Sequence, residues 1–101
     1  MAEGTADFEI EWQWNVRERF SIAGRGVVIV GGHSGRMPEV GESVTVAFGK
    51  NAVDAVVVGI EIGQQLNEDG TRGQFLGICL GGITKEAVPV GGVVLPRQSR
   101  N

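Results

Sequence analysis

Residues 20–30 read FSIAGRGVVIV and predict a chain reversal between two strands. An alternating apolar segment runs into AGRG at residues 23–26, and four consecutive aliphatic residues follow at 27–30. Glycine adopts backbone conformations that other residues resist, so Gly24 and Gly26 indicate a tight turn. The aliphatic segment is apolar on both faces. Either both of its sides are covered, or one of them faces a partner.

The segment before this turn alternates apolar and polar side chains, as in a strand with one apolar face. Trp12 and Trp14 are in phase with its other apolar residues, so core or interface packing is favoured over a stacking platform for bases. The same phase continues into the turn segment. The apolar positions are Phe8, Ile10, Trp12, Trp14, Val16, Phe20 and Ile22.

Further short apolar segments follow at turn-marked spacing, and no window shows sustained helical periodicity. This pattern predicts an all-β domain of six or seven strands. Residues 31–35 (GGHSG) indicate a turn, and the polar residues 63–73 indicate a loop. The two-residue period predicts one shared core formed by Val44, Val46, Val56, Val58, Ile60, Ile78 and Leu80.

Length and composition indicate one ordered domain. The chain has 101 residues and a mass of 10.7 kDa, with 42% hydrophobic and 21% charged residues. We expect the domain to occupy residues 8–96 and to stand alone, between a flexible leader (1–7) and a polar tail (97–101). The N-terminal residues do not resemble a signal peptide, and no apolar segment approaches the ~20 residues that span a bilayer. These features favour a soluble, cytoplasmic protein.

The charges and reactive side chains exclude several function classes. A net charge of −3 opposes non-specific nucleic-acid binding, which normally needs a basic excess. One histidine, His33 in a Gly-rich turn, and one cysteine, Cys79, cannot form a structural zinc site or an internal disulfide. No phosphate-binding GxxxxGK[ST] element is present. We therefore expect no catalytic residue, metal, cofactor or nucleoside triphosphate.

Glu61 is the sharpest candidate for a binding role. The two-residue period places it on the face opposite Ile60, beside Gly59, which leaves open surface next to the carboxylate. An exposed carboxylate can accept hydrogen bonds from ribose hydroxyls. On the pattern alone, a solvated glutamate is the plainer interpretation.

Five segments, in this order, resemble the second domain of the elongation factor Tu class of translation GTPases. They are residues 20–30, 40–46, 59–62, 77–83 and 91–95, within a matching region of residues 17–96. The resemblance implies a small, closed, mostly antiparallel Greek-key barrel. In that class, this domain holds the terminal adenosine of aminoacyl-tRNA.

The resemblance also implies which residues would form an RNA site. The Glu of Gly59-Ile60-Glu61 would contact the ribose, and residues around the first turn would line the adenine pocket. The sequence departs from the class at Gln64, which replaces a basic residue, and at Phe75, which replaces an Asn beside the aminoacyl group. The adenosine pocket is thus partly kept and the aminoacyl pocket is not. The implied RNA-binding residues are Ile22, Gly24, Val28, Glu61 and Cys79.

Two functions remain open. The first is a non-enzymatic interaction module whose outer face binds a protein or a second copy of the chain. The two-sided apolar segment at residues 27–30 and the acidic balance favour it. The alternative is a module that weakly binds an RNA 3′ end through one adenosine, which Glu61 and the residues around the first turn favour.

Overall fold

The computed structural model describes residues 10–97. The predicted leader (1–7), Phe8 and residues 98–101 of the predicted tail lie outside this range. The described chain forms β-strands and one turn of 3-10 helix, η2 (Lys85–Ala87). The strands are β1 (Trp12–Asn15), β2 (Glu18–Ile22), β3 (Gly26–Val30), β4 (His33–Gly35), β5 (Ser43–Phe48), β6 (Asn51–Leu66), β7 (Arg72–Gly81) and β8 (Val93–Pro96).

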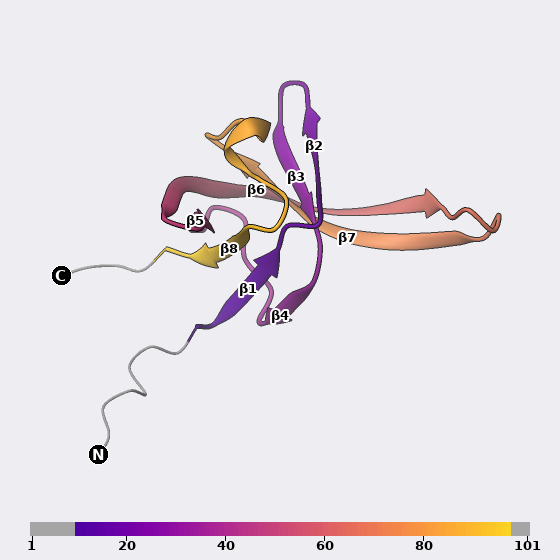
Figure 1. Cartoon of the computed structure of the whole chain (residues 1–101), viewed down its shortest axis with the longest axis horizontal. Coiled ribbons are helices and arrows are strands. Elements are labelled where there is room, and N and C mark those ends of the chain that lie inside the picture. The colour runs from indigo at the N-terminus through magenta and orange to yellow at the C-terminus, as the bar shows by residue number, and fades with distance from the viewer. Residues whose placement is uncertain (1–9, 98–101) are drawn as a thin grey trace, which may run out of the picture.

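The strands form one eight-stranded sheet in the order β2-β3-β7-β6-β5-β8-β1-β4, and every pair in it is antiparallel. The predicted all-β, antiparallel architecture is therefore confirmed. The predicted closed barrel of six or seven strands is wrong. The sheet has two ends, β2 and β4, and no ladder joins them within residues 10–97. The sheet instead curls around one core without closing (Figure 1).

A bend interrupts the ladder of the first hairpin and divides it into two strand pairs, which stand at the two ends of the strand order. β1 and β2 run along one side of this hairpin, and β3 and β4 run along the other. Backbone bonds from Arg17 N to Val30 O (2.9 Å) and from Asn15 N to Gly32 O (2.7 Å) cross the bend. The two ends of the sheet thus belong to one bent hairpin. Residues 31–35, predicted as a turn, are this bend followed by strand β4.

Gly31 makes the bend possible. A Cβ atom built on it would overlap the carbonyl oxygen of Asn15 and approach Arg17 N to 3.1 Å. Two backbones approach this closely only where no side chain separates them. The bend also shifts the phase of the apolar residues. Val16, before it, is buried, whereas Phe20, after it, is exposed on the outer face, contrary to the continuous phase that the sequence predicted.

The core lies inside the curl of the sheet. Trp12 and Trp14 are both buried in it, which confirms their predicted packing, whereas Ile10 is exposed. Within residues 27–30, Val27 and Ile29 also join the core and Val28 is buried on the other face, so the chain itself covers both sides. Neither the two tryptophans nor the aliphatic segment at residues 27–30 needs a second copy of the chain to cover it. The buried cluster is completed by Val16, Val44, Val46, Val57, Ile78, Leu80, Val88 and Val94.

A β-bulge in β6 corrects the predicted core. The register passes from Val57↔Leu80 to Gly59↔Cys79, so Val58 is an extra residue without a partner in β7. Val57 is consequently fully buried and Val58 is 41% exposed, the reverse of the prediction. Ile60 still packs against the core, because the bulge restores the phase beyond it, while Val56 is half-buried. The other predicted core residues, Val44, Val46, Ile78 and Leu80, are confirmed.

The ends of β6 and β7 extend beyond the body as a two-stranded arm (Figure 1). Residues 63–73, predicted as a loop, pair instead from Gly63↔Phe75 to Leu66↔Arg72, and only residues 67–71 form the tip. A solvated ribbon carries many polar side chains, so its composition resembles that of a loop. The arm accounts for the elongated dimensions of 53 × 28 × 25 Å.

A charged cluster holds the start of β5 against β1. The Trp12 indole N–H donates to Glu42 (3.0 Å), and Arg36 donates to Glu42 (2.8 Å) and to Glu11 (2.6 Å). Arg36 lowers the pKa of Glu42 from its ordinary value near 4.5 to about 2, against the opposing effect of burial, and the Trp12 bond adds to the lowering.

This cluster predicts a loss of stability in acid. Because the folded state lowers the pKa of Glu42, its contribution is complete above about pH 4.5 and disappears as the pH falls toward 2. Urea unfolding of the wild-type chain and of Glu42→Gln should show a clear difference in the free energy of unfolding at about pH 7 and little difference at about pH 2. A difference that stays constant across this range would contradict the assigned role of Glu42.

Candidate functional site

An apolar hollow of about 340 Å³ opens on the outer face of the sheet, at the base of the arm. Cross-strand neighbours point to the same face, so the pair Phe20↔Val28 on β2 and β3 shares a face with Cys79, the β7 partner of Val28. β6 adds Glu61, whose partner in β7 is Gly77. The hollow is lined by Phe20, Ile22, Val28, Glu61, Ile62 and Phe75.

The hollow gathers three of the five residues that the resemblance implies for RNA binding: Ile22, Val28 and Glu61. Gly24 lies in the β2–β3 turn with a φ of 78° and does not line the hollow. Cys79 is fully buried beside Val28, and burial raises the pKa of its thiol. Cys79 is therefore a packing residue with a protonated thiol, not part of the exposed wall.

Glu61 lies on the predicted face, but its carboxylate is not free. Arg25, from the β2–β3 turn, forms an ion pair with it. A Cβ built on Gly59 would lie 3.1 Å from Glu61 Oε2 and 3.4 Å from the Arg25 guanidinium. Gly59 thus leaves the space that the ion pair occupies. The sequence predicted open surface beside Glu61, but Arg25 reaches from the β2–β3 turn into this space.

Two aromatic rings form the wall nearest the arm. The Phe20 and Phe75 ring centroids are 6.4 Å apart. Phe75 lies over Gly63, its cross-strand partner, and a Cβ on Gly63 would overlap the ring. Sequence analysis noted Phe75 only as a departure and did not assign Phe20 to the site. The paired Gly63 and Phe75 are the signal that could have revealed a ring folded over the ribbon.

The opposite face of the arm continues the core face into solvent. Beyond the core pair Ile60↔Ile78, the next side chains on this face come from Ile62, 73% exposed, and Leu66, 70% exposed. Ile62 lies at the base of the arm and also borders the outer hollow. We call this set of residues the arm stripe. It consists of the cross-strand pairs Ile62↔Leu76, Gln64↔Gln74 and Leu66↔Arg72.

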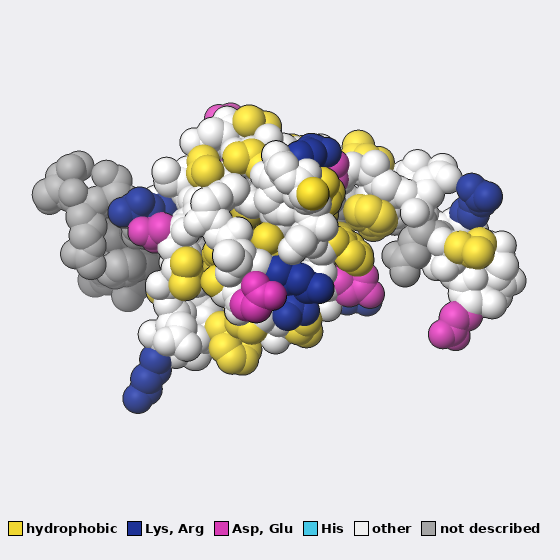
Figure 2. All heavy atoms as spheres, turned by 90° about the horizontal axis from the view of Figure 1, so that it is seen from above, with side chains coloured by type: hydrophobic (Ala, Val, Ile, Leu, Met, Phe, Trp, Pro, Cys, Tyr) yellow, Lys and Arg dark blue, Asp and Glu magenta, His cyan; other side chains and the backbone are white. Residues whose placement is uncertain are grey.

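The edges of the arm are also open. β5 pairs with β6 only as far as Val56, and β3 pairs with β7 only from Gly77 to Leu80. No described strand lies along either edge of the arm beyond these points. Figure 2 shows hydrophobic side chains at the base of the arm and again near its tip. The arm therefore exposes apolar side chains and unpaired backbone together.

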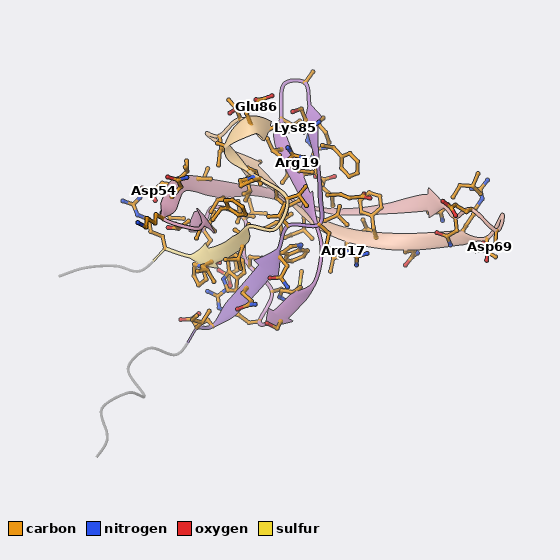
Figure 3. All side chains as sticks on the ribbon, in the orientation of Figure 1. Arg17, Arg19, Asp54, Asp69, Lys85 and Glu86 are labelled. Atoms are coloured by element: carbon orange, nitrogen blue, oxygen red, sulfur yellow. The ribbon has the colours of Figure 1, made fainter. Side chains whose placement is uncertain are left out.

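A second hollow, of about 330 Å³, lies beside the arm's base near the bend of the first hairpin. Trp14, Arg17, Glu18, His33 and Gln74 contribute to its walls. His33, which the sequence placed in an exposed turn, is half-buried in β4 with its ring centroid 4.8 Å from that of Trp14. The labelled Arg17 lies where the arm leaves the body (Figure 3).

No protein-family model matches this sequence. Among the residues that the structure describes, no group of three His, Cys, Asp or Glu side chains is placed to hold a metal ion. Between residues 10 and 97, no helix has the length and apolar character needed to cross a membrane.

Proposed function

We propose that this chain is a non-enzymatic interaction module that binds a protein through its arm. The observation that carries the proposal is the arm stripe, where Ile62 and Leu66 are each about 70% exposed beyond the body. Single exposed aliphatic residues are common on protein surfaces. Here they follow one face of a projecting ribbon, in register with the core, which is typical of a surface that packs against another polypeptide.

The open edges support the same proposal. A two-stranded ribbon is marginally stable alone in water. Proteins usually protect an exposed edge with proline, lysine or a bulge. Residues 59–66 contain no proline or lysine, and their one charged residue, Glu61, is paired with Arg25. A bound polypeptide would cover the stripe and supply strand partners to these edges. We propose no catalytic role and no cofactor.

The likeness to the second domain of elongation factor Tu remains part of the proposal. An antiparallel sheet curled around one core, with a Gly-turned β2–β3 hairpin and Glu61 beside Gly59, is compatible with descent from that barrel. Fold alone does not transfer function, so the function is argued from the arm and the hollow.

A second candidate is weak binding of an RNA 3′ end, and the outer hollow favours it. Ile22, Val28 and Glu61 share this hollow with Phe20 and Phe75, whose rings could stack on an adenine. The ribose would compete with Arg25 for the Glu61 carboxylate. That competition, together with the few phosphates engaged, favours low affinity.

One experiment separates the two candidates. The immobilised chain is incubated with a native extract, with and without nuclease, beside two variants: Leu66→Lys on the arm stripe and Val40→Lys as a control. Val40 is a similarly exposed aliphatic residue in the segment before β5. We expect nuclease-resistant capture of polypeptides by the wild-type chain and Val40→Lys, reduced at least tenfold by Leu66→Lys.

Capture that survives Leu66→Lys unchanged would contradict the arm proposal. Capture that nuclease abolishes, and that Glu61→Ala weakens, would favour the RNA candidate instead. An NMR titration with an RNA ending in CCA then tests it directly, through shifts at Val28 and Glu61.

A further inference from the structure

On its β6 side, the arm stripe has the same apolar–polar–apolar pattern in both directions, whereas its β7 side runs from Arg72 through Gln74 to Leu76. Along β6, Ile62 and Leu66 flank Gln64, and in β7 Gln74 stands opposite Gln64. Such a surface can pack on itself under a twofold rotation, in which contacts are reciprocal: if one residue of the first copy meets a second residue of the other copy, the reverse contact also forms. The arm stripe is therefore suited to a second copy of itself.

A twofold axis through the Gln64↔Gln74 pairs gives specific contacts. With the two stripes face to face and antiparallel, Ile62 lies on Leu66 of the second copy, and Gln64 lies on its own counterpart. An amide carries both donors and an acceptor, so Gln64 can bond to an identical side chain. The aliphatic stem of Arg72 covers Leu76 of the second copy, while its guanidinium donates to Gln64 of its own arm (3.4 Å).

Charge selects the antiparallel arrangement over the parallel one. The tip of the arm carries Glu68 and Asp69, and Arg17 lies at its base (Figure 3). Antiparallel arms place the acidic tip of each copy over the base of the other. Parallel arms would place the two acidic tips together, which costs free energy through like-charge repulsion.

The dimensions of the arm allow this contact. The tip begins three residues beyond Gln64, and Glu61 at the base lies three residues before it. At a rise of ~3.3 Å per residue, both distances from the axis are about 10 Å. Glu18 lines the same hollow as Arg17 and carries the opposite charge. The contribution of Arg17 can therefore be isolated only by exchanging its charge with that of Glu68.

We propose that the chain forms a reversible homodimer by antiparallel, face-to-face packing of its two arm stripes. This inference rests on the proposed function, since it names the polypeptide that the arm binds. The stripe has six residues per copy, well below the roughly 20–30 residues per partner of a stable complex. The dimer should therefore dissociate on dilution.

Analytical ultracentrifugation across a concentration series from about 10 µM to about 1 mM tests the proposal, because small interfaces of this kind are populated only at high concentration. The mass should rise from 10.7 kDa toward twice that value. Leu66→Lys should weaken association at least tenfold, whereas the control Val40→Lys should leave it unchanged. All of these positions are exposed, so circular dichroism should show the same fold throughout.

A charge exchange tests the arrangement of the arms. Arg17→Glu and Glu68→Lys should each weaken the dimer several-fold, and the two together should restore it to near the wild-type level. Glu68 is chosen because Asp69 accepts hydrogen bonds from the Thr71 amide (3.0 Å) and hydroxyl (2.6 Å), which shape the tip.

Each contrary outcome is decisive. A mass of 10.7 kDa at every concentration overturns the inference, as does a dimer that Leu66→Lys does not weaken or a charge exchange that does not restore it. A monomer that still captures other polypeptides through Leu66 contradicts the homodimer but not the proposed function. A monomer without Leu66-dependent capture overturns the proposed function as well.

Discussion

Gly31→Ala should destabilise the chain by about 3 kcal/mol or more, a large part of the 5–15 kcal/mol that holds a typical domain folded. The added methyl would overlap the carbonyl oxygen of Asn15, and the nearest atoms are all backbone, so no side chain can move aside. The strands must separate at the bend. This breaks the bonds from Asn15 N to Gly32 O and from Arg17 N to Val30 O.

Gly32→Ala is the matched control. A Cβ on Gly32 meets only the side-chain amide of Asn15, at 3.4 Å, and this residue does not have a left-handed φ. Its free energy of unfolding should change by less than about 1 kcal/mol, and the reduced freedom of the unfolded chain would even favour folding slightly. Urea unfolding of both variants measures the difference. Equal stabilities would show that the backbones of the two hairpin sides do not approach each other closely at Gly31.

Val57→Asp should prevent folding, whereas Val58→Asp should fold. Val57 is fully buried among apolar side chains, and an unpaired carboxylate there costs several kcal/mol or more. Val58 is 41% exposed on the bulge, so the same change costs about 1 kcal/mol through lower strand propensity. Circular dichroism and amide NMR spectra of the two variants distinguish these outcomes.

This pair of neighbours tests the bulge itself. An unbroken two-residue period would bury Val58 and expose Val57. If the Val57→Asp variant folds and the Val58→Asp variant does not, the strand has no bulge and follows that unbroken period. The bulge also keeps Ile60 inside and Glu61 on the outer face. The position of the candidate site therefore depends on it.

Local patterns were sufficient for the class of fold and for many of its turns. The Gly24 turn and the buried Trp12 and Trp14 follow from turn chemistry and a period of two. Each of these features involves only a few neighbouring residues, so the amino-acid sequence by itself determined them. Ile22 and Val28, which the resemblance implied for the site, enter the hollow because β2 and β3 form one hairpin.

Features that depend on contacts between distant segments were decided only by the tertiary structure. The bend at Gly31 depends on the approach of Asn15, the bulge at Val58 on the register with β7, and the ion pair of Glu61 on Arg25. The arm also required the fold, because a polar, solvated ribbon has the composition of a loop until its partner strand is known. A period of two specifies which residues share a face, but it does not specify where the chain skips a residue or ends its pairing. Those choices follow from fitting eight strands around one core, and they placed the exposed stripe on the arm.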